Sequence, residues 1–263
     1  MIMNAKLVIA ERIPFDAQKK LMPLFKTRID KLSSSLDVSV QLRLTASGFV
    51  SAEIEGSDSE FFVELIKREM RLAPRDLSEI EINDNLKAFV IGINKKRQGI
   101  EVGIGPISMK AKCEVANESL TAQLCDGRDI SVERVAQTYC LEEGVPILVR
   151  ITSVDPGRRQ IEAWIADDQI VRFEQWRRER FHRIIAIGGS QEELREAVRL
   201  SRTERDVIEI EGLSFTASSL VCKLGTEAPG IIAIIGRYIS NFKLHAFLPE
   251  RIDKLRTEFA GRQ

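Results

Sequence analysis

The residues of this sequence with the most evident chemistry are five cations on two short turns between β-type stretches. They are Lys95, Lys96 and Arg97 on the first turn, and Arg158 and Arg159 on the second. Lysine and arginine side chains neutralise phosphates, and each neutralised phosphate adds to nucleic-acid affinity. The two turns therefore form a candidate site for the phosphate backbone of a nucleic acid. Exposed hairpin turns are also charged for solubility alone, so that alternative stays open.

A further group of arginines lies in residues 168–181, which have the spacing of an amphipathic helix. Phe173 and Trp176 belong to its apolar stripe. We expect this helix to connect two domains and to pack its aromatic side chains between them. Its arginines would extend the basic turns if both lie on the same side of the protein. The candidate phosphate-binding residues of this helix are Arg172, Arg177 and Arg178.

Residues 220–232 read as a strand, a loop bounded by glycines, and the start of a helix. Free amides at a helix N-terminus bind anions, and glycine lets a ligand approach the backbone closely. Glu227 opposes an anionic ligand at this place. A tight connection that binds nothing, and contact with RNA or a protein, are the alternatives. The residues of this candidate ligand loop are Lys223, Gly225, Thr226, Pro229, Gly230 and Arg237.

The sequence shows no grouping of residues typical of an enzyme. Its two histidines, His182 and His245, have no evident partner, and its four cysteines form no C-x-x-C pair. Catalysis needs a nucleophile, an acid–base pair or a metal in one place, and structural zinc needs closely spaced ligands. We therefore predict a protein that is not an enzyme, with no catalytic residues, no metal, no cofactor, and reduced, buried thiols.

Length and charge restrict the partners. The 263 residues suit two or three small domains. The net charge is zero, from 39 basic and 39 acidic residues, so a partner must bind through local patches. No apolar run approaches the ~20 residues needed to cross a membrane, and Lys6 and Glu11 interrupt the only stretch that resembles a signal peptide. We predict a cytoplasmic protein with no membrane contact and no DNA-specific motif.

The first third of the chain has a βαββαβ pattern, which is the order of a ferredoxin-like module. Pro23 interrupts the helical spacing of residues 15–36, so we expect the longer part of that helix to begin at or after it. A second helical stretch begins near Asp58. The expected strands are residues 6–13, 38–44, 49–55 and 77–82.

The middle of the chain reads as two hairpins, residues 87–104 and 145–165, which flank a strand and a short helix. This is the layout of a five-stranded OB barrel, in which the 1–2 and 4–5 loops frame the oligonucleotide face. Residues 99–105 have the pattern G-x-x-V-x-x-G and resemble the S1 RNA-binding subfamily. Ile100 stands where S1 domains usually place a stacking aromatic, so contact with the backbone of folded RNA is favoured over base stacking.

The last third repeats the βαββαβ pattern, with a capping box that begins at Ser190. Several of its segments, together with residues 124–129 and Trp176, resemble an archaeal family classed as a domain of unknown function, the "2110" family. The segments are residues 205–210, 221–232 and 235–236. The resemblance implies an archaeal setting and supplies no catalytic residues.

The expected fold is α+β, with two ferredoxin-like βαββαβ modules flanking a central OB/S1-like β-barrel. We interpret the chain as a non-enzymatic RNA- or ribosome-associated factor that binds phosphates through the basic tips of its barrel and could form a homodimer through a ferredoxin-like module. A ligand-sensing regulatory protein that uses the 225–230 loop and a protein-assembly scaffold are the alternatives. The expected divisions are residues 1–85, 86–167, a connecting helix 168–182, residues 183–250, and a C-terminal tail 251–263.

Overall fold

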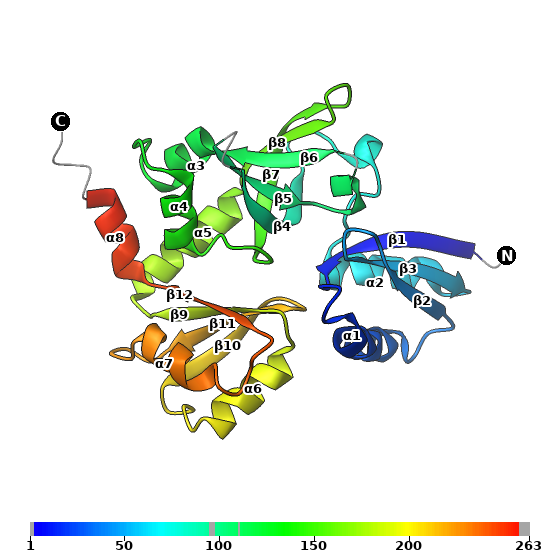
Figure 1. The fold of residues 1–263 in the computed structure, drawn as a ribbon. Helices are drawn as coiled ribbons and strands as arrows, with labels where there is room; N and C mark the ends of the chain where they lie inside the picture. The colour runs from blue at the N-terminus through cyan, green and yellow to red at the C-terminus, as the bar shows by residue number, and fades with distance from the viewer. Residues whose placement is uncertain (1–2, 95–97, 110, 258–263) are drawn as a thin grey trace.

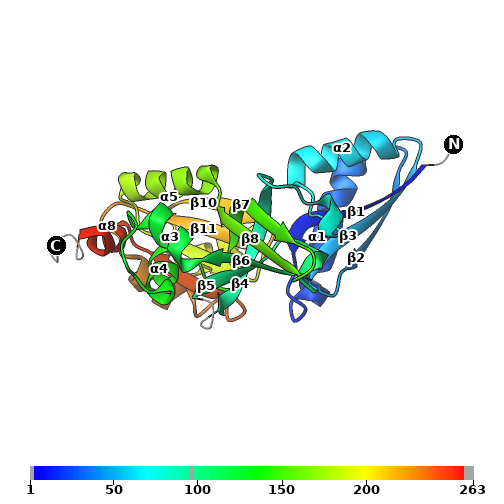
Figure 2. The ribbon, with the colours of Figure 1, turned by 90° about the horizontal axis from the view of Figure 1, so that it is seen from above.

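A computed structural model of the chain describes residues 3–94, 98–109 and 111–257. The predicted phosphate-binding residues Lys95, Lys96 and Arg97 lie outside these ranges. The described residues form an α+β structure with a closed barrel and two further sheets. Figure 1 shows the N-terminal sheet at one end of the molecule and the barrel above the C-terminal sheet at the other. Seen from above, the N-terminal sheet and its helices again stand apart from the rest (Figure 2).

The N-terminal module is an antiparallel sheet with its helices on one face. Within the described residues its strands follow the order β1-β3-β2. Ile54 points toward the helices and shares a core with Phe25 and Phe62, whereas Phe49, on the opposite face, packs edge-on against Phe89 of the barrel. The elements are β1 (Met3–Arg12), α1 (Gln18–Ser33), β2 (Ser39–Leu44), β3 (Phe49–Gly56) and α2 (Ser59–Met70).

Helix α1 runs through Pro23, so the predicted start at or after this proline is wrong. Pro23 is exposed, while Leu21 and Phe25 on either side of it are fully buried. A proline inside a helix costs roughly 3 kcal/mol, but burying an apolar side chain contributes about 1.5–3 kcal/mol. The buried stripe, which also includes Ile29, therefore outweighs the proline.

The strand predicted over residues 77–82 is also wrong. A 3-10 turn, Leu77–Glu79, takes its place, and the Asp76 carboxylate accepts a hydrogen bond from the Ser78 amide at 2.9 Å. Such local side-chain bonds compete with sheet pairing. The chain runs beside β1 before this segment instead, with an isolated bridge between Ile9 and Leu72 and a hydrogen bond from the Ala73 amide to the Val8 carbonyl at 2.9 Å.

The barrel closes in the order β4-β5-β6-β8-β7, with β6 parallel to β8 and the other pairs antiparallel. Ser131 caps the second of two helices that connect β6 to β7 by accepting from the Arg134 amide. A second 3-10 turn, Pro106–Met109, follows β5. The other elements are β4 (Asn85–Asn94), β5 (Gly99–Gly103), β6 (Lys112–Ala116), α3 (Asn117–Leu124), α4 (Val132–Tyr139), β7 (Pro146–Asp155) and β8 (Gln160–Ile165).

The C-terminal module has the predicted βαββαβ order, and its strands pair antiparallel as β10-β11-β9-β12. The capping box of Ser190 and Glu193 begins its first helix, as expected. The elements are β9 (Arg183–Ile187), α6 (Gln191–Leu200), β10 (Val207–Ser214), β11 (Ala217–Cys222), α7 (Ala228–Ile235) and β12 (Lys243–Phe247).

The barrel and the C-terminal sheet share one hydrophobic core. Ile185 and Phe247 of the sheet belong to the same buried cluster as the barrel interior and Trp176 of the connecting helix α5 (Asp167–Glu179). The opposite face of the sheet packs on α6 and α7 in a separate cluster. Residues 86–250 are therefore joined by packing as well as by the chain.

The segment expected to be a C-terminal tail instead forms helix α8 (Pro249–Thr257) as far as it is described. Ile252 and Leu255 are buried in the barrel core. Arg256 donates to the Leu124 carbonyl at 3.1 Å and to Glu174 at 2.6 Å, which fixes α8 against α3 and α5. No helix within the described residues is long and apolar enough to span a membrane.

Candidate nucleic-acid interface

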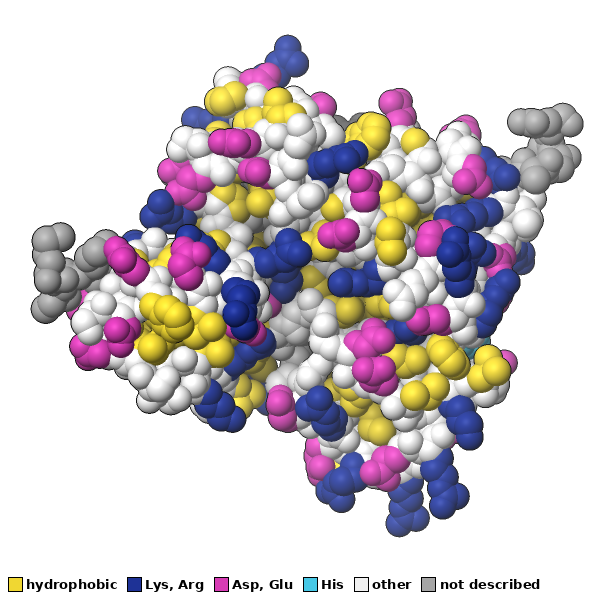
Figure 3. Space-filling model, turned by 180° about the vertical axis from the view of Figure 1, so that it is seen from behind, with side chains coloured by type: hydrophobic (Ala, Val, Ile, Leu, Met, Phe, Trp, Pro, Cys, Tyr) yellow, Lys and Arg dark blue, Asp and Glu magenta, His cyan; other side chains and the backbone are white. Residues whose placement is uncertain are grey.

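A cleft of about 760 Å³ lies where the N-terminal module, the barrel and the C-terminal module meet. Its walls are formed by α1, the end of α2, the start of β7, α5, the start of α6 and the β10–β11 hairpin. Figure 3 shows the corresponding face hollowed between the N-terminal lobe and the rest, with Lys and Arg side chains on both sides of the hollow. The cleft thus combines residues that are far apart in the sequence.

Cations outnumber carboxylates along the cleft. Four of them make no ion pair with any described residue. They are Arg28 and Lys31 of α1, Arg71 after α2, and Arg172 of α5. Two of the three lining carboxylates face other cations, because Glu69 lies 3.4 Å from Arg68 and Glu192 lies 4.0 Å from Arg195. This leaves a cleft with excess positive charge supplied by separate elements.

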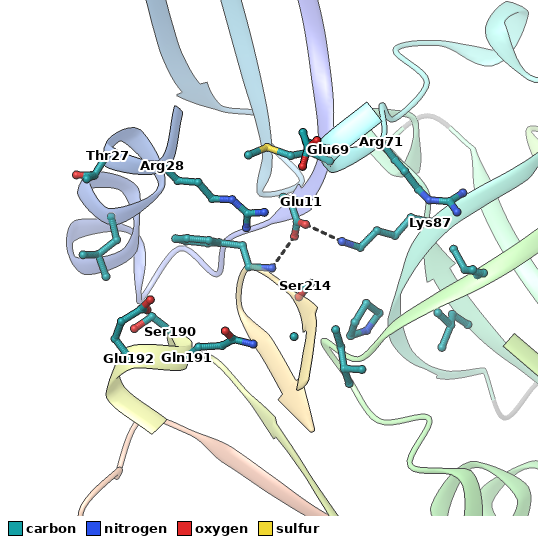
Figure 4. Close-up of a pocket in the computed structure, with 18 of the residues that line it drawn as sticks. Glu11, Thr27, Arg28, Glu69, Arg71, Lys87, Ser190, Gln191, Glu192 and Ser214 are labelled. Atoms are coloured by element: carbon teal, nitrogen blue, oxygen red, sulfur yellow. Dashed lines mark hydrogen bonds and ion pairs between the residues drawn. The ribbon is translucent and has the colours of Figure 1, made fainter. Parts of the chain in front are cut away.

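The third carboxylate, Glu11 of β1, joins all three modules. It is buried, and its Oε1 lies 2.6 Å from Nζ of Lys87 on β4. Its Oε2 accepts the backbone amide of Phe215, in the β10–β11 hairpin, at 2.9 Å. Both interactions are drawn in Figure 4, where Arg28 and Arg71 lie on either side of Glu11. Because Lys87 neutralises Glu11, this carboxylate does not cancel the charge of the other cations.

Arg71 has an unusual backbone conformation, with φ 58° and ψ 154°. This region is almost restricted to glycine and costs about 1–3 kcal/mol for other residues. The conformation is held because the Arg71 amide donates to the Lys67 carbonyl at 3.3 Å and the Arg71 carbonyl accepts from Ala10 at 3.1 Å. This conformation places the Arg71 side chain at the cleft. Glycine at the same position would carry less backbone strain.

The predicted basic residues are separated in the structure. Arg172 of α5 lines the cleft together with Pro146 at the start of β7. Arg158 and Arg159 lie just past the far end of this ten-residue strand, about 30 Å away at about 3.3 Å per residue. Arg177 pairs with Glu174 at 3.0 Å and Asp253 at 2.9 Å, and Arg178 is exposed. The expected continuous surface from turns to helix is therefore not formed by the described residues.

The barrel face beside these turns carries a row of glutamates. Glu101, Glu114 and Glu162 are direct cross-strand neighbours on β5, β6 and β8. Lys112 lies 3.6 Å from Glu101, and Arg158 lies 3.6 Å from Asp155. Glu101 and Glu162 add negative charge to this part of the barrel, and Glu114 between them is buried.

The 225–230 loop offers few free amides for an anion. The Ala228 amide donates to Nδ1 of His182 at 3.3 Å, and Pro229 has no N–H. Nε2 of His182 lies 3.2 Å from Glu250, so this histidine connects α7 to α8. Lys223, Gly225, Gly230 and Arg237 are exposed and Thr226 is half-buried. The exposed glycines make the loop accessible to a ligand. At the start of α7, however, the Ala228 amide already donates to His182 and is not free to bind an anion.

Nucleophilic chemistry has little support in the described residues. All four cysteines are buried and unbridged, as predicted. Burial raises the pKa of the Cys113 and Cys140 thiols to about 12, and that of Cys125 and Cys222 to about 11. Such thiols hold their protons and are poor nucleophiles. No group of three or more His, Cys, Asp or Glu residues in the described ranges could hold a metal ion.

A family model matches the C-terminal module. Residues 181–246 match the family model of the DUF2110 C-terminal domain. The resemblance predicted from the sequence is confirmed for these residues. We found no match among curated protein sequences.

Two solved structures are similar to parts of the chain. One is the uncharacterized protein MJ1198 from Methanocaldococcus jannaschii, with 17% identity and a TM-score of 0.24 over 34% of this chain and 96% of that chain. The other is a chain of an a/eIF2alpha–aDim2p–rRNA complex from Pyrococcus horikoshii OT3, with 12% identity and a TM-score of 0.25 over 47% of this chain and 64% of that chain.

Proposed function

We propose that this protein is a non-enzymatic, cytoplasmic RNA- or ribosome-associated factor, and that the cleft between its modules holds phosphates of the RNA backbone. The observation that supports this proposal is the set of cleft cations without an ion pair to described residues. They come from three separate parts of the chain and face one hollow. Like charges that lie close together repel each other, and an anionic partner bound between them would offset this repulsion.

The cleft favours contact with the backbone over contact with bases. Base stacking on aromatic rings contributes about 1–3 kcal/mol per base. Phe215 is the aromatic residue among the described lining residues, and its ring packs edge-on against Phe25 with centroids 4.9 Å apart. The ring is therefore engaged with the core. Charge and shape, which suffice for folded RNA, are what the cleft offers.

We also propose the finer description of the fold. The order β4-β5-β6-β8-β7, with helices between the third and fourth strands, supports an OB/S1-like barrel. The order β10-β11-β9-β12 supports a ferredoxin-like module over residues 183–250. Residues 1–85 would then be a shortened relative of that module, lacking its last strand. We keep the divisions 86–167 and 168–182 as part of this proposal, beside barrel strands that run from Asn85 to Ile165 and a helix α5 at Asp167–Glu179.

The test is binding of a fluorescein-labelled RNA hairpin across a salt series, with two variants that each remove two cations. The cleft variant is Arg28→Ala/Arg172→Ala, and the matched control at the barrel turn is Arg158→Ala/Arg159→Gly. Each phosphate contact contributes about 0.7–0.9 to the slope of log affinity against log salt. We expect the cleft variant to lower the slope by about 1.5, and the control to leave it nearly unchanged.

Co-sedimentation with ribosomal subunits, with the same variants, tests the ribosomal part of the proposal. If only the control variant loses binding, the phosphate-binding site lies at the barrel turn of Arg158 and Arg159. If both variants have equally small effects, neither the cleft nor the barrel turn contacts phosphates of the RNA. Cleavage or modification of the RNA during the assay would contradict the non-enzymatic assignment.

A further inference from the structure

Helix α7 is apolar on all sides, although one side faces solvent. Its sequence, Ala-Pro-Gly-Ile-Ile-Ala-Ile-Ile, contains no polar side chain. Ala228, Ile231 and Ile235 are buried against the sheet, whereas Ile234 is 42% exposed. Tyr238, one turn after Ile234, is 50% exposed. A helix that is apolar all round is usually buried, so the outer face of α7 is suited to a partner.

The two ends of this outer face carry opposite charges. Glu227 precedes α7 and Arg237 follows it, and both are exposed. Gly230 and Ile234 share one face of α7, and continuing its spacing of about 100° per residue places the flanking residues Glu227 and Arg237 at the two ends of the same face. Neither charged residue makes an ion pair with a described residue. The face therefore has a negative end, an apolar middle and a positive end.

We propose that this face is a self-association surface, on which α7 packs antiparallel against α7 of a second copy of the chain. A two-fold axis brings each residue of one copy opposite its counterpart in reversed order. Glu227 of each copy then meets Arg237 of the other, about 15 Å along the helix from its own Arg237. A parallel arrangement would instead place like charges together. The charge pattern is thus complementary to itself in one orientation.

The middle of the face allows close contact. A Cβ atom added at Gly230 would meet no described atom within 4 Å, so the space above this glycine is open. In the antiparallel arrangement Ile234 of one copy lies near Gly230 of the other, because these residues are placed symmetrically between the charged ends. A glycine lets a neighbouring helix approach closely. Leu224, which is 69% exposed before the helix, extends the apolar surface.

The surface is smaller than the roughly 800 Å² per partner that stable complexes bury, since it consists of one short helix and its flanks. We therefore expect a weak dimer that forms as the protein concentration rises. This inference does not depend on RNA binding, because α7 contributes no residue to the cleft.

Sedimentation velocity of the full chain over a micromolar to millimolar concentration series tests the proposal. Wild-type protein should shift from monomer to dimer, and Ile234→Glu should remain monomeric. The matched control Leu200→Glu adds the same charge at an exposed leucine of α6 and should dimerise like the wild type.

Charge reversal distinguishes this interface from others. Glu227→Arg should weaken dimerisation about tenfold or more, because two attractive pairs become repulsive. The double variant Glu227→Arg/Arg237→Glu should restore it, since the pattern is again complementary to itself. A wild type that is monomeric at every concentration would overturn the proposal. The proposal would also be overturned if the double variant has the circular dichroism of the wild type but does not dimerise.

Discussion

The ion pair between Glu11 and Lys87 should control how firmly the modules are held together. The two side chains are only 6% and 12% exposed, and the Glu11 carboxylate also accepts the Phe215 amide. Glu11→Ala would leave a nearly buried ammonium group without its carboxylate and a backbone amide without its acceptor. Breaking a buried pair by removing one partner costs about 3–5 kcal/mol, and an unsatisfied buried donor costs about 1–3 kcal/mol.

The loss should lie near the lower end of the combined range. Lys87 borders the cleft, so water can reach its ammonium group once Glu11 is gone. We expect Glu11→Ala to lower the free energy of unfolding by about 4–5 kcal/mol. Glu11→Gln keeps an oxygen acceptor for Phe215 and should cost less. Lys87→Met should be harmful alone, because it leaves the Glu11 carboxylate buried and unpaired.

The decisive measurement is a double-mutant cycle with Glu11→Gln and Lys87→Met. Urea unfolding followed by tryptophan fluorescence and circular dichroism gives the free energy of each variant. The double variant should lose about 2 kcal/mol less than the sum of the single losses, because no charge is left buried without a partner. Losses that add within about 0.5 kcal/mol would refute the reasoning and show that the pair does not stabilise the protein.

Three further predictions concern backbone strain, thiols and acid stability. Arg71→Gly should raise the unfolding free energy by up to about 1 kcal/mol in urea titrations, by relieving strain, while weakening RNA binding. Native protein should not react with DTNB until it is unfolded, because its thiols are buried and their pKa values are raised. Burial raises the pKa of Glu174, but hydrogen bonds from Arg256 and Arg177 lower it overall from 4.5. Its stabilising effect should therefore be lost as pH falls below about 4.5, and Glu174→Gln should flatten the acid limb of a stability–pH curve.

The sequence predicted the elements that depend on regular alternation and turn chemistry. The barrel hairpins and the C-terminal βαββαβ order follow from period-two apolar patterns bounded by glycine, proline and asparagine. The capping box at Ser190 was predictable because both of its hydrogen bonds form between residues three apart. Such features need only local interactions, so a single sequence contains their signals.

Features decided by competition between local and distant interactions were predicted less well. Pro23 was expected to begin or break a helix, but the burial of its neighbours prevailed. The strand over 77–82 was lost to the Asp76 side chain. The cleft itself was not predictable, because no spacing rule relates Arg28, Arg71 and Arg172. Of its residues without an ion pair, Arg172 alone was singled out, from its place in a basic helix.

The interaction of Glu11 with Phe215 has a consequence for how the protein is made. The two residues are 204 positions apart, so the carboxylate has no amide partner until the third module has been synthesised. At about 5–20 residues per second, roughly 10–40 s pass between the synthesis of Glu11 and that of Phe215, and the cleft lacks one wall during that time. Any chain that ends before the β10–β11 hairpin lacks one wall of the cleft. Binding at the cleft would therefore report that translation has passed this hairpin, and a truncated product would be distinguished by its failure to bind.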